Sequence, residues 1–151
     1  DRLFVLIDEA KKNEPNNASL YYVEGNIHKQ LGNVEKAVES YYECAEINPD
    51  YEFGYIGAGI LFYEKAVELS EKASNEFDDK KYEALVADFN TALKNAIEPF
   101  EKAFEVSKDN GIKVNIAEYL KNIYYRFSSD SQEYMDGYKK YDAIVKSGQA
   151  M

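Results

Sequence analysis

Apolar residues follow one another along the chain at intervals of three and four, the spacing that gathers side chains on one face of an α-helix. The pattern is strongest over residues 62–77 and 82–100, on either side of a short polar break. Only 3 Pro and 8 Gly interrupt the 151 residues, and so low a content of helix breakers favours long helices over a sheet. The pattern therefore predicts an all-α fold.

The chain matches itself when it is shifted by 34 residues. At this shift Pro15 coincides with Pro49, and Gly25 coincides with Gly59. In both places a proline follows one helical segment and a glycine lies inside the next. A fixed period of this length is typical of a repeated helix–turn–helix unit.

The unit from Ala18 to Tyr51 resembles the tetratricopeptide repeat, which has the same period. Counted from Ala18 as position 1, its signature positions 4, 8, 15, 20, 24, 27 and 32 hold Tyr21, Gly25, Gly32, Ala37, Tyr41, Cys44 and Pro49. Small residues at positions 8, 20 and 27 let two helices approach closely, and large residues fill the gaps between turns. The departures are Glu24 at position 7, His28 at position 11 and Val34 at position 17.

The resemblance assigns the rest of the chain to further repeats. Residues 1–14 correspond to the second helix of a preceding repeat, so we expect more repeats upstream. Residues 52–108 correspond to a repeat with a helical insertion of about 25 residues, and 113–147 to a divergent repeat. The spacing in the insertion predicts that both helices are lengthened by about three turns and joined at 77–80.

The fold that this resemblance implies is a single domain over 1–151. It is a right-handed α-solenoid of antiparallel helix pairs, from which the inserted long helical hairpin projects. The hairpin is expected to be ordered, because a solvated linker would lack apolar residues at helical spacing. Pro99 should kink the returning helix, since proline removes one backbone hydrogen bond and crowds a preceding carbonyl.

Composition excludes several classes of function. Acidic residues outnumber basic ones 28 to 18, for a net charge of -10, which disfavours binding to nucleic acid or to an anionic membrane surface. No apolar run approaches the length of roughly 18 residues that spans a membrane. With 1 Cys and 1 His, the chain offers neither a disulfide framework nor a zinc site of N and S ligands. We expect no metal and no cofactor.

Individual residues that could carry chemistry have structural interpretations. His28 is expected to be packed at an aromatic core position, and Cys44 to be a buried thiol. The segment GYIGAG at 54–59 lacks the strand that a phosphate-binding glycine loop requires, so its glycines indicate close helix packing. Gly57 is predicted to face the concave surface, where it would floor a shallow pocket. Asp78 and Asp79, at the predicted hairpin tip, are interpreted as a helix cap rather than calcium ligands.

In tetratricopeptide proteins the first helices of the repeats line a concave groove that binds peptides. The resemblance places these partner-binding candidates in that groove: Tyr22, Asn26, Lys29, Phe53, Ile56, Gly57, Tyr63, Tyr119, Asn122 and Arg126. Further residues at the same repeat positions are Val23, Gln30, Ile60, Asn115 and Tyr125. Aromatic rings with interleaved amides suit peptide recognition, although part of the tyrosines is expected to serve packing. Lys29 and Arg126 are the groove cations, so an acidic peptide would bind near them.

One specialised version of the groove can be tested against the sequence. Proteins that capture acidic chaperone tails use Lys at position 5 and Asn at position 9 of one repeat, with Asn at position 6 of the next. Here Asn26 matches, but Tyr22 and Gly57 occupy the other two positions. The sequence therefore argues against a carboxylate clamp for chaperone tails.

The function predicted from these features is a protein–protein interaction scaffold without catalysis, whose partner is a protein or peptide. The alternatives are a structural module that stacks with upstream repeats or with its own copies through the hairpin, and an enzyme with an unrecognised carboxylate site. The Tyr-rich second repeat and the run at 124–127 look similar to exported bacterial tetratricopeptide proteins, which favours a periplasmic location. The chain begins with Asp1 rather than Met, which indicates a processed or trimmed product.

Overall fold

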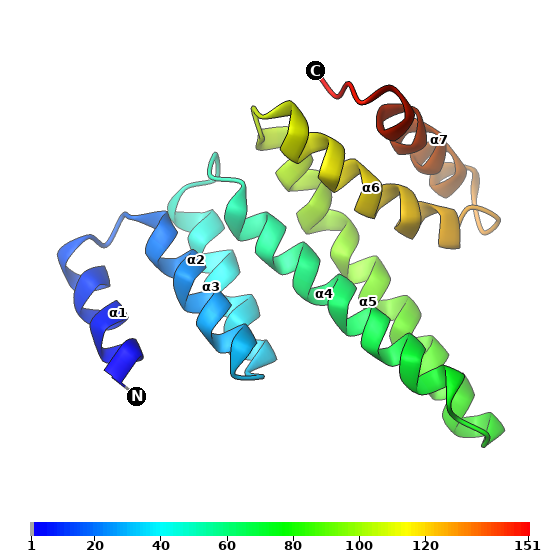
Figure 1. Ribbon diagram of the computed structural model, residues 1–151, viewed down its shortest axis with the longest axis horizontal. Coiled ribbons are helices and arrows are strands. Elements are labelled where there is room, and N and C mark those ends of the chain that lie inside the picture. Colours follow the sequence, from blue (N-terminus) through cyan, green and yellow to red (C-terminus); the bar gives the residue numbers. More distant parts are fainter. Residues whose placement is uncertain (1) are drawn as a thin grey trace.

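The computed structural model describes residues 2–151, so Asp1, the first residue of the expected leading helix, lies outside it. The described residues form only helices: α1 (Arg2–Asn13), α2 (Ala18–Gln30), α3 (Val34–Ile47), α4 (Phe53–Ser74), α5 (Asp79–Val106), α6 (Asn110–Arg126) and α7 (Gln132–Ser147). The prediction of an all-α, tetratricopeptide-type helical solenoid is confirmed. Consecutive pairs α2–α3, α4–α5 and α6–α7 stack along the molecule, with α1 packed on α2 (Figure 1).

Helices α2, α5, α6 and α7 begin where a polar side chain can satisfy a free backbone N–H group. The caps are Asn17, Asp78, Asp109 and Ser131, which accept hydrogen bonds from the amides of Ser19, Lys81, Ile112 and Tyr134. The interpretation of Asp78 as a helix cap is therefore confirmed. Gly32, in the turn between α2 and α3, has a φ of 79°, a conformation that residues with a Cβ rarely adopt.

The core of the first repeat is built around the ring of Tyr41, which is 1% exposed. Gly25 of α2 and Gly57 of α4 lie against this ring, and a Cβ atom on either would come within 2.6 Å of a ring carbon. The small residues are thus required because the Tyr41 ring fills the space where their side chains would stand. Gly57 packs between helices and does not floor a pocket, which corrects the expectation from the sequence.

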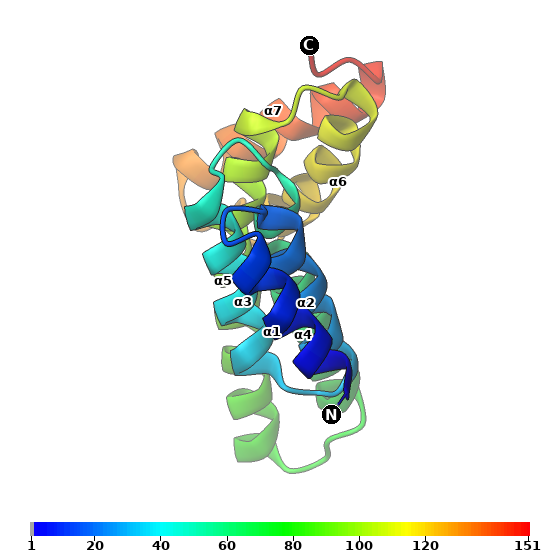
Figure 2. The ribbon, with the colours of Figure 1, turned by 90° about the vertical axis from the view of Figure 1, so that its left-hand side faces the viewer.

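Helices α4 and α5, of 22 and 28 residues, form a long antiparallel hairpin. Figure 2 shows its tip projecting beyond the ends of the other helices. The connection occupies 75–78, two residues earlier than expected, because Asp78 caps α5. Helix α5 continues through Pro99, which is buried in the core. Within the connection, by contrast, the side chain of Phe77 is 96% exposed.

The last pair starts earlier than the sequence pattern suggested. Helix α6 begins at Asn110 rather than near 113, because Asp109 provides the cap. Leu120 and Tyr124 are buried, and Gly137 of α7 lies against the Tyr124 ring. The Tyr124 hydroxyl donates a hydrogen bond to the Glu101 carboxylate, which joins α6 to α5.

Buried phenols and a buried thiol make stability fall at alkaline pH. Burial raises the pKa of Tyr41 and of Tyr141 to about 12, and the pKa of the Cys44 thiol to about 11. The unfolded chain loses the thiol proton above about pH 9 and the phenol protons above about pH 10, while the folded chain keeps them. Between its unfolded and folded pKa values, each group therefore lowers the unfolding free energy by about 1.4 kcal/mol per pH unit. Chemical denaturation from pH 8 to 12 should show a decline that begins near pH 9 and steepens near pH 10; constant stability to pH 12 would contradict it.

Candidate functional site

A pocket opens between α4 and α6, on the side of the molecule where the first helices of the pairs lie. Its volume is about 510 Å³. The lining residues are Phe53, Ile56, Ile60, Tyr63, Phe100, Ile112, Asn115, Ile116, Glu118, Tyr119 and Asn122. Most of these side chains are apolar or aromatic, and a few polar groups stand among them, the composition usual for a recognition site. We call this set of residues the α4–α6 pocket.

Three aromatic rings form the rigid centre of the α4–α6 pocket. The ring of Tyr119 stacks on Phe100 with centroids 4.7 Å apart and an interplanar angle of 14°. Tyr63 meets the same ring edge-on, at a centroid distance of 4.9 Å. Both are favoured geometries for aromatic pairs, so the rings hold one another in place.

Two carboxylates act on the hydroxyl of Tyr119. Burial raises the pKa of Tyr119, and the negative charges of Glu64 and Glu118, with the neighbouring Tyr63, raise it further. Of the two, only Glu118 lines the pocket. Glu64 is paired with Lys29 of α2, whose ammonium lies 3.0 Å from a carboxylate oxygen.

The partner-binding candidates predicted from the sequence separate into two groups. Phe53, Ile56, Tyr63, Tyr119 and Asn122 line the α4–α6 pocket, and so do Ile60 and Asn115. Tyr22, Asn26, Lys29, Gly57 and Arg126 do not line it. The structure thus brings together five candidates of α4 and α6, while the candidates of α2, together with Gly57 of α4 and Arg126 of α6, lie outside the pocket.

The residues of α2 support the core of the first repeat. Tyr22 packs against the rings of Tyr41 and Phe53, at centroid distances of 6.0 and 5.7 Å. Asn26 accepts a hydrogen bond of 2.6 Å from the Tyr41 hydroxyl. These contacts hold Tyr41 in place, and through Phe53 they also support one edge of the pocket.

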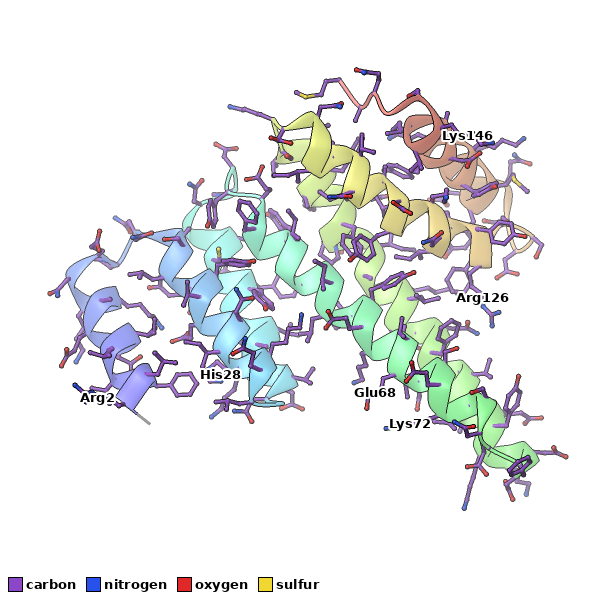
Figure 3. The ribbon with its side chains drawn as sticks, in the orientation of Figure 1. Arg2, His28, Glu68, Lys72, Arg126 and Lys146 are labelled. Atoms are coloured by element: carbon purple, nitrogen blue, oxygen red, sulfur yellow. The ribbon has the colours of Figure 1, made fainter. Side chains whose placement is uncertain are left out.

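Arg126 faces the hairpin. Its Nε donates a hydrogen bond of 3.2 Å to the side-chain oxygen of Asn90, and its guanidinium lies 5.1 Å from the centroid of the Phe89 ring. Figure 3 shows Arg126 between the end of α6 and the hairpin. It lines a separate pocket of about 230 Å³ with residues of α4 and α5. Arg126 therefore does not supply a cation to the α4–α6 pocket, contrary to the expectation from the sequence.

Four lining residues were missed by the sequence reasoning: Phe100, Ile112, Ile116 and Glu118. Phe100 was expected only in the core, and it reaches the pocket through its contact with Tyr119. The other three lie on α6, whose register was set by a start near 113. The sequence did contain a signal for the start of α6: Asp109 stands directly before the helix, and its side chain accepts a hydrogen bond from the amide of Ile112, three residues later.

His28 was expected to be a packed core residue, and it is partly buried. Its ring stacks on Phe4 of α1 with centroids 4.5 Å apart, and Nδ1 is buried without a hydrogen-bond partner within residues 2–151. Cys44 is buried, as the sequence predicted. Among the described residues, no three His, Cys, Asp or Glu side chains gather as a metal site would require. In the same part of the chain, no helix has the length and apolar character needed to cross a membrane.

Comparison with known proteins supports a tetratricopeptide protein. Residues 18–51 match the family model of the tetratricopeptide repeat. A TPR repeat-containing protein of the archaeon Methanocaldococcus jannaschii is 44% identical over 63 residues, which make up 41% of this chain and 11% of that protein. The match thus spans only a small part of its relative. No solved structure gives a significant match.

The matching relative is archaeal. The comparison therefore gives no support to the bacterial origin or the export that the Tyr-rich sequence suggested. The repeat that matches the family model is the one whose signature positions were assigned from the sequence.

Proposed function

We propose that this protein is a scaffold that binds a segment of a protein partner in the α4–α6 pocket and has no catalytic activity. Tetratricopeptide repeats generally mediate protein–protein interaction, and proteins that contain them are typically scaffolds without enzymatic activity. The observation that carries the proposal is the pocket of about 510 Å³ between the first helices of two neighbouring pairs.

The chemistry of the lining supports a peptide rather than a small polar metabolite. Partly buried Phe53, Ile56 and Ile60 along α4 offer apolar contact area, and Tyr63 and Tyr119 add rigid rings. Asn115 and Asn122 are exposed on α6, where their amides can donate to and accept from a peptide backbone. Apolar anchors with a few polar groups at the rim are the usual composition of a protein interface.

A single substitution can block the pocket without disturbing the core. Asn122→Arg places a long charged side chain at an exposed position of the lining and should weaken partner binding at least about tenfold, as loss of a hot spot does. Asn95→Arg makes the same change at an exposed site of α5 outside this pocket and should bind like the parent. Partners recovered by affinity capture and identified by mass spectrometry would be measured by calorimetry. Equal affinity in Asn122→Arg and the parent would move the binding site elsewhere.

A second candidate function is self-association through the hairpin. Phe77, at the hairpin tip, is 96% exposed, so its ring is available to pack against a partner, which would remove its apolar surface from water. We propose that 52–108 form one repeat whose lengthened helices carry this ring away from the solenoid. A second copy or a neighbouring repeat array would then cover it.

The oligomeric state tests this second candidate. The parent should show a molar mass that rises with concentration in light scattering, and Phe77→Ser should remain monomeric. Val67→Ser, at an exposed site on the shaft of the hairpin, serves as the control and should behave as the parent. A parent that stays monomeric at every concentration would rule out self-association, while leaving the proposal for the pocket intact.

A further inference from the structure

We infer that the segment bound in the α4–α6 pocket is basic, with a Lys or Arg next to an apolar side chain. The cation would lie between the ring of Tyr119 and the carboxylate of Glu118, and the apolar side chain would enter the pocket. This inference rests on the proposed function and names the chemistry of the partner.

The pocket lining carries negative charge only. Glu118 is the one charged residue among the lining side chains, and no Lys, Arg or His lines the pocket. Glu118 is exposed, and no salt bridge joins it to a cation of residues 2–151. An acidic peptide would place its carboxylate beside Glu118 with no cation in the lining to receive it. A basic peptide instead supplies the missing partner.

The nearby cations are already engaged by the protein itself. Lys29 contacts both carboxylate oxygens of Glu64, at 3.1 and 3.0 Å, so its charge is balanced within the fold. Arg126 lies against Asn90 and Phe89 of α5, on the side of the hairpin. Neither of the two cations expected from the sequence to attract an acidic peptide lines the pocket.

The aromatic centre adds apolar contact for the stem of a long basic side chain. Tyr63 and Tyr119 stand in the same lining as Glu118, and the charges of Glu64 and Glu118 both reach the Tyr119 hydroxyl. The head group of a Lys or Arg placed there can pair with the Glu118 carboxylate while its alkyl stem packs against the rings. The net charge of -10 also attracts a basic segment from a distance, an effect that added salt weakens.

A random-peptide display library selected on the folded parent protein tests the inference, because it offers basic, acidic and neutral segments to the pocket together. Each enriched peptide is rescreened on Asn122→Trp, which fills the same exposed position without adding charge and so identifies the peptides that need the pocket. Pocket-dependent peptides should be enriched in Lys and Arg beside aromatic or aliphatic residues. One such peptide, synthesised with Lys and with Gln at the basic position, is then measured against Glu118→Gln and against Glu39→Gln, an exposed control on α3.

The expected result is that Glu118→Gln weakens the Lys peptide about threefold to fivefold at low salt and leaves the Gln peptide unchanged. Glu39→Gln should change neither. Pocket-dependent peptides without basic enrichment, or an unchanged affinity in Glu118→Gln, would overturn the inference and leave the proposed function standing. The absence of any pocket-dependent peptide would count against both.

Discussion

Replacing Tyr41 by Ala is expected to lower the free energy of unfolding by about 3–5 kcal/mol, as for other large aromatic residues deleted from a packed core. The Tyr41 ring is 1% exposed and fills the space between Gly25 and Gly57, which have no side chains with which to close the cavity. Its hydroxyl also donates to Asn26, whose side-chain oxygen would lose this partner. Thermal unfolding followed by circular dichroism should show the loss.

The matched control is the next residue in the chain. Tyr42 is 38% exposed, and Tyr42→Ala should cost much less than Tyr41→Ala because water already covers part of its ring. Gly57→Leu tests the same contact from the other side, since the new side chain would have to displace the Tyr41 ring, at a cost of about 1–3 kcal/mol or more. If Tyr41→Ala melted within a degree of the parent, the Tyr41 ring would not be the centre of this core.

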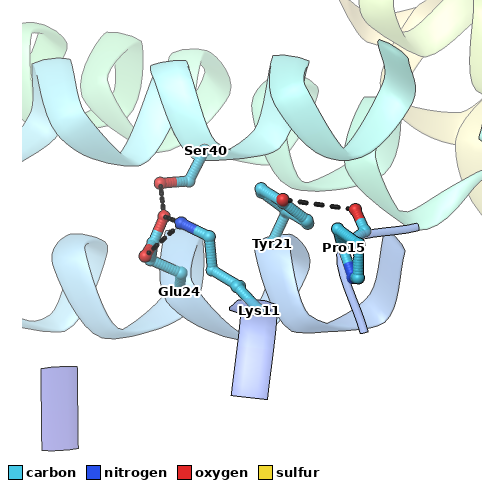
Figure 4. Close-up of polar contacts among 5 residues, drawn as sticks. All are labelled: Lys11, Pro15, Tyr21, Glu24 and Ser40. Atoms are coloured by element: carbon cyan, nitrogen blue, oxygen red, sulfur yellow. Dashed lines mark hydrogen bonds and ion pairs between the residues drawn. The ribbon is translucent and has the colours of Figure 1, made fainter. Parts of the chain in front are cut away.

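The second large effect is expected from the polar contact that joins α1 to the first repeat. Glu24, which stands where the repeat usually has a Leu, is 8% exposed and accepts hydrogen bonds from Lys11 of α1 and Ser40 of α3 (Figure 4). Lys11 also lies 4.6 Å from the centroid of the Tyr21 ring. Lys11→Met leaves the carboxylate buried without its cation and should cost about 2–3 kcal/mol, somewhat less than for a fully buried pair.

Replacing both charged residues by apolar ones should recover the stability lost in Lys11→Met. In the double variant Lys11→Met, Glu24→Leu neither charge remains buried, and its stability should equal or exceed that of the parent. The exposed pair Lys72–Glu68 provides the control, because Lys72→Met should cost at most about 1 kcal/mol. Chemical denaturation of the four combinations at Lys11 and Glu24 gives the coupling energy. A coupling near zero would mean that the ion pair does not hold α1 in place.

The pH dependence of this contact has a defined direction. Burial by itself lowers the pKa of Lys11, but the hydrogen bond to Glu24 and the charge of that carboxylate outweigh it, so the pKa is raised above 10.5. The stabilisation by Lys11 is then fully present below about pH 10.5 and is lost as the pH rises through the folded-state pKa. It adds to the alkaline decline expected from the buried phenols. The unfolding free energy of Lys11→Met should therefore fall less with rising pH than that of the parent.

The helices themselves could be predicted from the sequence. Repeat positions and apolar spacing are local features, and they located the first full repeat and the long hairpin to within a few residues. The requirement for glycine at Gly25 was also visible, since its place in the repeat implies close approach of two helices. The connection at 75–78 and the start of α6 were displaced by two or three residues, because in both places an Asp cap decided the helix start.

The site depended on contacts that no local pattern records. Arg126 and Asn122 lie one helical turn apart on α6, yet Arg126 turns to Asn90 on the hairpin while Asn122 lines the pocket. Likewise, Glu24 can be buried only because Lys11, 13 residues away, reaches it from another helix. The sequence by itself determined where helices form, because hydrogen bonding and periodicity act over a few residues. Tertiary packing alone decided which side chains share a pocket and which charges neutralise one another, because those contacts join residues from separate helices.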